Sequence, residues 1–180
     1  GGTRAALLGS REALFPKKRR HPEELAVAGL LERQARKLGP LESRQRHHLV
    51  WRETPSGESL TDITPRIEAA VQSSGVSEGL CAIFVPHTTA ALAVNSAIDD
   101  NTLRDIREEL HRLVPTRADF HHIYDTPADA AGHIKATLIG HSVLLAVENG
   151  TLVLGGSQSI LFYEFDGPRD RRVQVKVIPG

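Results

Sequence analysis

The stretch that decides the fold is LCAIFVPHTTAALAV, residues 80–94. Its first part, 80–85, is a short apolar run of β-forming side chains between a glycine and a proline, which predicts a buried strand. The run breaks at once into the polar turn 87–89, and a second apolar run at 90–94 predicts another strand. A sheet holds still the polar groups that follow its strands, so this turn is a candidate functional site.

Strands and helices are expected on both sides of this stretch, in the order strands, helix, strands, two helices, strands. This order lacks a strict alternation of strand and helix. The sequence therefore predicts an α+β fold, a single compact domain with a largely antiparallel sheet and packed helices. The further expected strands are 48–54, 59–63, 141–147, 151–154, 158–164 and 171–178.

Three helices are expected in this domain because apolar side chains recur there at helical spacing. The first is closed by Gly75, the second covers 102–113, and the third covers 130–139. Short polar side chains just before a helix satisfy its free backbone N–H groups. The expected N-caps are Thr64 for the first helix, one of Asp99, Asp100 and Asn101 for the second, and Asp129 for the third.

The chain divides into two parts. Residues 22–38 predict a helix with a weak apolar stripe, which Gly39 and Pro40 end. We therefore expect a basic extension at 1–45, partly helical or disordered, followed by the main domain at 46–180. The length of 180 residues suits one such domain with an appendage.

Charge is distributed unevenly, although the 22 Lys and Arg balance the 22 Asp and Glu. Eleven of the basic residues but five of the acidic ones fall within residues 1–46. The basic run 17–20 is a candidate contact for nucleic acid, but no aromatic residues are interleaved there to stack on bases. A solvated tail explains the run better, and we expect no nucleic-acid partner.

Cysteine usage and hydropathy indicate the compartment. Cys81 is the one cysteine and lies in an apolar strand, so no internal disulfide forms and a reducing cytoplasm is the simpler expectation. We expect it to act as a small buried hydrophobic side chain. No apolar run approaches the ~20 residues that cross a bilayer, so we expect no membrane partner.

Histidines supply a candidate metal site. His87 lies at the end of a strand, His122 in a loop and His133 in the first turns of a helix, and separate elements such as these can converge on one ion. Neutral imidazole is the commonest metal ligand, and three histidines with an open fourth position are typical of catalytic zinc. No two histidines lie four apart on one helix. Loop histidines that bond to the backbone therefore stay open as the alternative.

A second candidate cluster comprises Glu164, Asp166 and Arg169, where an apolar strand runs into a turn. The carboxylates are candidate bases or metal ligands, and Arg169 is suited to bidentate binding of a phosphate. The alternative is a charged turn with an internal Asp–Arg pair. Four further side chains are candidates for substrate binding: Thr88, Thr89, Asn95 and Gln158.

Familiar catalytic motifs are absent from the sequence. It contains no Gly-x-Ser-x-Gly elbow, no Cys-His nucleophile pattern and no dinucleotide fingerprint. The flexible run 155–157 (Gly-Gly-Ser) lacks the following lysine of a phosphate-binding P-loop. Nothing in the sequence therefore favours covalent catalysis or hydride transfer.

Four blocks of sequence, taken in order, resemble the YjbQ family, also called the uncharacterised protein family 0047. The resemblance spans about residues 46–178 and leaves out the basic extension. The blocks are 85–92 with Asn95, 131–136 (Ala-Gly-His-Ile-Lys-Ala), 154–155 with Gln158, and 164–169 (Glu-Phe-Asp-Gly-Pro-Arg).

This resemblance implies a compact α+β domain that assembles as a homotrimer. It implies a pocket with His87, His133 and an upstream histidine, placed at His122 with His121 as the competing choice. A divalent metal ion, zinc or magnesium, is the implied cofactor. Some members are described as secondary thiamine-phosphate synthases, which join a pyrimidine diphosphate to a thiazole phosphate and release pyrophosphate.

Two positions depart from the family pattern. Ser157 stands where the family usually has Trp, which removes a large aromatic surface from a substrate or subunit contact. Asp129 stands where many members have Asn. This change keeps the expected cap and adds a charge near His133, which would raise the proton affinity of the histidine or supply an extra ligand.

Two functions follow from these residues. The first is an enzyme acting on a phosphorylated small molecule, in which His87 and His133 hold a metal or donate a proton, Arg169 neutralises the leaving group, and Glu164 or Asp166 is a base. The second is a homotrimeric module without turnover that binds a metal or ligand through the same histidines. The first is the expected function because of the family resemblance.

Overall fold

The computed structural model describes residues 46–51 and 54–180, with side chains from Thr54 onward. These residues belong to one compact unit. The predicted helix at 22–38 and the expected extension at 1–45 lie outside the described residues.

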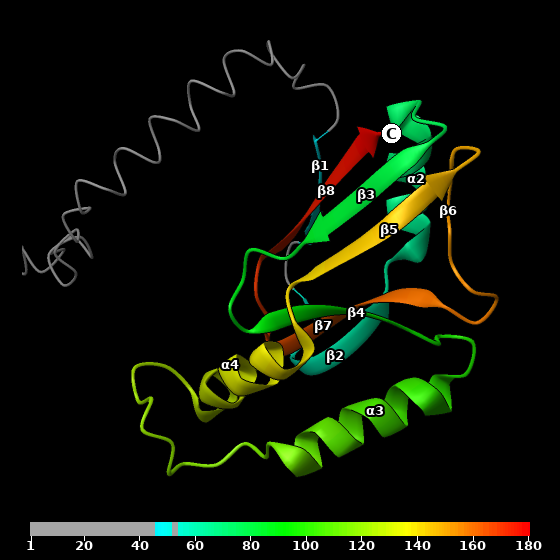
Figure 1. The fold of residues 1–180 in the computed structure, drawn as a ribbon. Helices are drawn as coiled ribbons and strands as arrows, with labels where there is room; N and C mark the ends of the chain where they lie inside the picture. Colours follow the sequence, from blue (N-terminus) through cyan, green and yellow to red (C-terminus); the bar gives the residue numbers. More distant parts are fainter. Residues whose placement is uncertain (1–45, 52–53) are drawn as a thin grey trace, which may run out of the picture. The chain divides into compact units, whose positions relative to one another are not determined.

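Eight strands and three helices follow one another in the order expected from the sequence (Figure 1). Each element lies within a few residues of its predicted position. The elements are β1 (Arg46–Trp51), β2 (Gly57–Asp62), α2 (Thr64–Ser74), β3 (Gly79–Phe84), β4 (Ala90–Asn95), α3 (Asp100–Leu113), α4 (Pro127–Ile139), β5 (Ser142–Glu148), β6 (Thr151–Leu152), β7 (Ser159–Gly167) and β8 (Arg171–Pro179).

The strands form two sheets rather than one. The larger sheet has the order β1-β8-β3-β5-β6 and the smaller sheet the order β2-β7-β4. Every strand pair among the described residues is antiparallel. The predicted α+β class is therefore confirmed. The sequence did not indicate that the strands divide into two sheets.

Strand β7 is buried on both faces, because each face meets a different hydrophobic core. Ile160 and Phe162 join the core that also contains α2 and strands of the larger sheet. Leu161, Tyr163 and Phe165 alternate with them and join the second core, where side chains of α3 and α4 pack. Successive side chains of a strand point to opposite faces, so a continuous apolar run marks a strand covered on both sides.

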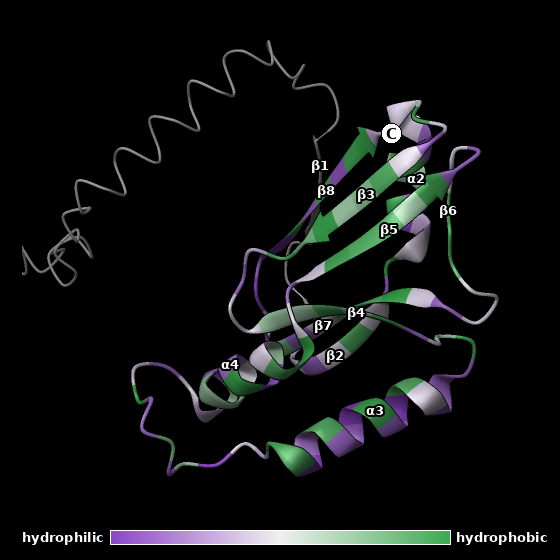
Figure 2. Cartoon of the chain, viewed as in Figure 1, coloured by the Kyte–Doolittle hydropathy of each residue, from purple (hydrophilic) through white to green (hydrophobic). Residues whose placement is uncertain are grey.

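Helix α3 lies at the periphery, and none of its residues is fully buried. Its partly buried side chains Leu103, Ile106 and Leu110 pack against the second core, and its remaining surface is charged. Figure 2 shows this helix in alternating apolar and polar bands. Leu113, at the end of this helix, is exposed.

Two of the three expected N-caps are wrong. Ile63 occupies the N-cap position of α2, and the Thr64 hydroxyl instead donates to Asp62 and accepts from the backbone N–H of Ile160. At α4 the cap is Thr126, whose hydroxyl accepts from the backbone N–H of Asp129. The Asp129 carboxylate is therefore free to turn elsewhere. The expectation for α3 is confirmed, because Asp99 Oδ1 accepts from Asn101 N.

Gly132 fixes how closely α4 approaches the smaller sheet. A Cβ atom added at this buried glycine would lie 3.1 Å from Cβ of Thr89 and 3.2 Å from Cβ of Phe165. Both neighbouring atoms are attached directly to the backbone, so they cannot rotate away. The missing side chain thus lets α4 pack directly against β7 and the turn before β4.

Replacing Gly132 with alanine tests this contact. Alanine favours a helix by about 1 kcal/mol over glycine, but overpacking a tight contact costs about 1–3 kcal/mol. We expect Gly132→Ala to lower the free energy of unfolding by about 1 kcal/mol net, measured by urea denaturation. The matched control is Gly156→Ala, where an added Cβ meets nothing within 4 Å. Equal stability of the two variants would contradict the proposed contact.

Candidate metal centre

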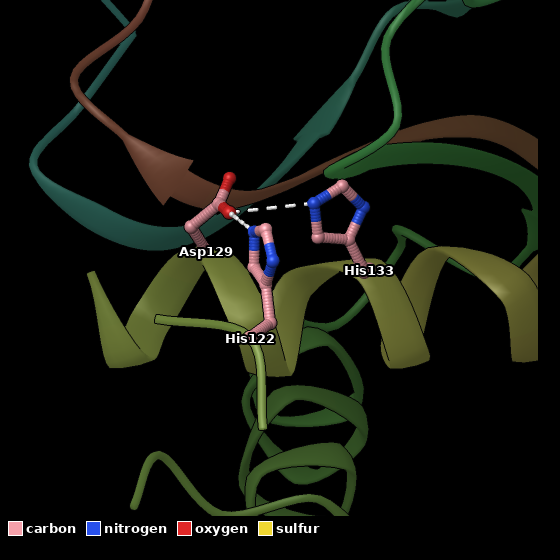
Figure 3. Close-up of side chains that lie close together, drawn as sticks. All are labelled: His122, Asp129 and His133. Carbon is pink, nitrogen blue, oxygen red and sulfur yellow. Dashed lines mark hydrogen bonds and ion pairs between the residues drawn. The ribbon is translucent and has the colours of Figure 1, made fainter. Parts of the chain in front are cut away.

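Two histidine side chains converge on one carboxylate oxygen of Asp129 (Figure 3). His122 Nε2 lies 3.0 Å from Asp129 Oδ2, and His133 Nε2 lies 3.3 Å from the same oxygen. Asp129 and His133 are four residues apart on α4, so they share one face of the helix. His122 reaches them from the loop between α3 and α4.

The spacing of these atoms suits a metal ion. Zinc binds imidazole nitrogen and carboxylate oxygen at about 2.0–2.2 Å in tetrahedral geometry, which separates neighbouring ligand atoms by about 3.3 Å. The two observed nitrogen–oxygen distances, 3.0 and 3.3 Å, are close to this separation. Both histidine side chains are 40% exposed and that of Asp129 is 13% exposed, so an ion would be reached from solvent on one side.

The capping of α4 explains why Asp129 is available. Because Thr126 caps the helix, the Asp129 side chain is released from the role that the sequence indicated. The rings of His122 and His133 meet edge to face, with centroids 5.2 Å apart and planes at 83°. This arrangement directs both Nε2 atoms at the carboxylate.

An arginine and two more carboxylates adjoin this centre. Carboxylate oxygens of Asp125, Asp129 and Asp166 all lie within 4.8 Å of one another. Arg169 donates to Asp166 Oδ2 from Nε at 2.9 Å and from Nη2 at 2.6 Å, and to Asp125 Oδ2 at 3.1 Å. The hydrogen bond and charge of Asp166 raise the pKa of Arg169. The predicted Asp–Arg pair therefore exists, and its guanidinium side chain remains 41% exposed.

An open hollow of about 500 Å³ borders the two histidines. Aromatic or apolar side chains make up its lining: Phe120, His121, His122, Ala130, His133 and Ile134. His121 thus borders the hollow, while His122 is the member of the pair that contacts Asp129.

His87 does not join this cluster. Its Nε2 accepts a hydrogen bond of 2.9 Å from the backbone N–H of Arg172, at the start of β8. Among the residues with described side chains, His87 belongs to neither group of convergent metal-ligand atoms. The structure therefore brings together two histidines of the predicted set, and Asp129 is the third member of the group.

The pKa of His87 is lowered, chiefly by partial burial and then by the charges of Arg171 and Arg172, against which Glu164 acts. Because Nε2 accepts the N–H of Arg172, the ring must be neutral with its proton on Nδ1 for this bond to form. The histidine therefore fastens the turn before β4 to the first residues of β8.

Glu164 lies in a buried ion pair rather than at an open site. Its carboxylate is 0% exposed and accepts from Arg171 Nε and Nη2, both at 2.6 Å. The hydroxyl of Thr54 and the backbone N–H of Asp166 also donate to it, each at 2.9 Å. Both carboxylate oxygens are therefore engaged in buried contacts, and the predicted base at Glu164 is not at an open site.

The four predicted substrate-binding residues are dispersed. Thr89 is buried, and its hydroxyl accepts from Arg171 Nη2 at 2.8 Å. Thr88 is exposed in the turn before β4. Asn95 and Gln158 are exposed, and their side chains accept from the backbone N–H of Ser96 and Gly155 respectively. Thr89 has a structural contact, and the contacts of Asn95 and Gln158 are local.

Sequence reasoning missed Asp125. Its carboxylate lies within 4.8 Å of that of Asp129 and accepts a hydrogen bond from Arg169, which lies 44 residues further along the chain. The Asp–x–x–x–His spacing of Asp129 and His133 was visible in the sequence. From sequence alone, this spacing indicates an N-cap at Asp129 followed by a metal ligand at His133.

The fold and this centre define a class: an α+β domain with two antiparallel sheets and a candidate metal site of two histidines and an aspartate. Residues 48–180 match the family model described as UPF0047 protein YjbQ-like. A UPF0047 protein of Archaeoglobus fulgidus is 45% identical over 127 residues, which cover 70% of this chain and 96% of that relative. The chain belongs to the YjbQ/UPF0047 family.

Solved structures of similar proteins have the same fold. The crystal structure of a YbjQ-like protein of unknown function from Sulfolobus solfataricus is 30% identical, with a TM-score of 0.70, over 75% of this chain and 96% of that one. A YjbQ/UPF0047 family protein of Clostridium acetobutylicum is 41% identical, with a TM-score of 0.65, over 74% and 98%. Within residues 46–51 and 54–180, no helix has the length and apolar character that spanning a membrane requires.

Removing Arg171 tests the buried pair. Breaking a buried ion pair from one side costs about 3–5 kcal/mol, because the remaining charge is left without a partner. We expect Arg171→Leu to destabilise the protein by this amount, and addition of Glu164→Gln to restore part of it, measured by denaturant unfolding. The matched control is Arg104→Leu, whose pair with Glu108 is exposed and should give no measurable change. Similar stabilities of the two arginine variants would contradict the assignment.

Acidification tests the bond to His87. A histidine with a lowered pKa binds its proton more weakly in the folded state than in the unfolded state, where the value is 6.5. Its contribution to stability is therefore full above pH 6.5 and is lost as the pH falls from 6.5 through the lowered pKa. We expect melting temperatures of the wild type and His87→Gln to converge between pH 7.5 and 5. A difference that stays constant over this range would contradict the role assigned to His87.

Proposed function

We propose that His122, Asp129 and His133 bind a divalent metal ion, zinc or magnesium, and that the centre acts on a phosphorylated small molecule. The observation that carries this proposal is the approach of two imidazole nitrogens to one carboxylate oxygen, at 3.0 and 3.3 Å. The two-nitrogen, one-oxygen donor set favours zinc over magnesium, which prefers oxygen ligands. Three protein ligands leave a fourth position for water or substrate.

Arg169 supports the choice of a phosphate as the group that is recognised. Its guanidinium group is partly exposed and is positioned by Asp166 and Asp125 beside the metal-ligand cluster. A bound cation and a guanidinium together neutralise the charge of a diphosphate leaving group. The aspartates supply the opposite charge that keeps the arginine in place when no phosphate is bound.

The specific reaction that we propose is the secondary thiamine-phosphate synthase reaction. In it, a ring nitrogen of the thiazole phosphate forms a C–N bond to the methylene carbon of the pyrimidine diphosphate. The C–O bond to the diphosphate breaks, and pyrophosphate leaves with that electron pair. Arg169 would hold the departing phosphate oxygens, and His122, Asp129 and His133 would hold the metal. The reaction requires no covalent intermediate, which agrees with the absence of a nucleophile motif.

The alternative function is a homotrimeric module that binds a metal or ligand without turnover. This alternative is supported because both predicted bases are engaged in ion pairs, Glu164 with Arg171 and Asp166 with Arg169. Under both functions we propose self-association into a trimer and a cytoplasmic location, the latter because Cys81 is a free buried cysteine.

Metal titration separates the three ligands from their neighbours. At 100 times its dissociation constant, Zn²⁺ should stabilise the wild type by about 2.7 kcal/mol, or roughly 5–10 °C in melting temperature. We expect His133→Ala and Asp129→Asn to bind Zn²⁺ at least about 10-fold more weakly, measured by calorimetry. His121→Ala is the matched control, because this ring borders the same hollow without contacting Asp129, and should keep wild-type affinity.

Product formation then decides between the two functions. Zinc-loaded or magnesium-loaded wild type should form thiamine phosphate and pyrophosphate from the two precursors, and His133→Ala and Arg169→Leu should not. Metal binding with a melting shift but no product above the His133→Ala background supports the binding module. Absence of metal binding by the wild type would reject the metal-dependent enzyme and leave only a module that binds another ligand.

A further inference from the structure

Two aromatic side chains lie in the loop that carries the proposed metal ligand His122. The chain has five Phe and two Tyr, and two of these seven, Phe120 and Tyr124, flank the metal ligand His122 in the loop before α4. Tyr124 is 93% exposed and its neighbour Ile123 is 77% exposed. Large side chains placed in water next to a site commonly contact a ligand or partner there.

Aromatic rings line the hollow, and a further aromatic ring lies beside it. The guanidinium carbon of Arg117 lies 4.7 Å from the ring centroid of Phe120, which steadies that partly buried ring by a cation–π contact. Phe120 and Ile134 line the hollow together with His122 and His133. The Tyr124 ring lies edge-on to His122, with centroids 5.9 Å apart.

The neighbours of the centre fall into two groups that differ in polarity. Toward Asp125, Asp166 and Arg169 the groups are charged, whereas toward the hollow they are aromatic or apolar. His122 and His133 belong to both groups, since they contact Asp129 and line the hollow. A ligand that satisfied both groups would carry a phosphate at one end and a planar apolar group at the other.

We propose that this hollow is a ring-binding subsite, in which Phe120 of the lining and Tyr124, which contacts His122 beside it, are specificity-determining residues that select an aromatic or heteroaromatic phosphate over a simple phosphate. The volume of about 500 Å³ is within the range of small-molecule sites. Flat rings gain from edge and offset contacts with phenylalanine, tyrosine and histidine rings. The inference rests on the proposed function, because the metal and Arg169 must hold the phosphate.

Two probes that differ by one ring test the subsite. Inorganic phosphate and phenyl phosphate are titrated by calorimetry into zinc-loaded protein from which free zinc has been removed. We expect the wild type to bind phenyl phosphate about 10-fold more tightly, which corresponds to about 1.4 kcal/mol. Phe120→Ala and Tyr124→Ala should each lose about 3- to 10-fold for phenyl phosphate and keep the affinity for inorganic phosphate.

Control variants and measurements accompany this test. Phe84→Ala removes another partly exposed aromatic side chain, on β3 of the larger sheet, and should leave both affinities unchanged. Tyr124 is almost fully exposed, so its variant remains informative if Phe120→Ala folds poorly. Zinc affinity and molecular mass in solution are measured for every variant.

The outcomes distinguish the subsite from the proposed function. Equal affinity of the wild type for both probes overturns the subsite and leaves the metal and phosphate sites standing. A loss shared by both probes, or a change of assembly mass in Phe120→Ala and Tyr124→Ala, also overturns it, because these two rings would then be structural or would contact a second copy. Failure to bind either probe rejects the phosphate site, and the subsite falls with it. A ring preference without thiamine-phosphate formation supports the subsite and rejects that reaction.

Discussion

The buried ion pair between Arg171 and Glu164 is the interaction on which the arrangement of the site depends. It lies where β7 of the smaller sheet continues into β8 of the larger sheet, so it fixes the joint between them. Charges removed from water must be matched by partners, and here Thr54, Thr89 and the backbone of Asp166 complete the match. Few other arrangements of these segments would satisfy both charges, and this favours a single geometry.

Helix α4 connects this buried region to the candidate metal centre. It packs on Thr89 and Phe165 at the position of Gly132, which is adjacent to His133 in the chain. The helix therefore presents Asp129 and His133 from a surface fixed by the core, while His122 comes from an exposed loop. A metal ion held by all three would tie this loop to the helix, so metal binding and the order of the loop would be coupled.

The structure also changes the chemical interpretation of the family blocks. The His-Thr-Thr turn and the Glu164 strand are engaged in contacts that hold the two sheets together. The exposed groups suited to a ligand are instead the two histidines near Asp129, Arg169 and the aromatic loop. Because solved relatives include a protein described as of unknown function, this division between structural and exposed groups gives mutational work on the family a starting point.

Local pattern determined much of the fold in advance. Alternating and continuous apolar runs located the strands, and Gly75 ended α2 in a left-handed conformation, with φ of 70°. The cap at Asp99 followed from residues adjacent in the chain. Asn149 and Gly150 both have positive φ, and an Asn-Gly pair is typical of such a turn between two strands. Such features depend on neighbours within a few residues, and for this reason the sequence specifies them.

Only tertiary structure decided which side chains meet. Thr126 rather than Asp129 caps α4, because two polar side chains compete for the same N–H groups and the one not used is free to approach the histidines. His87 was expected beside His122 and His133, but the antiparallel strands place it against β8. By itself the sequence therefore determined the elements and the candidate ligands. Their convergence was decided by packing between segments distant in the chain, because ligand distances depend on how helices and sheets are positioned against one another.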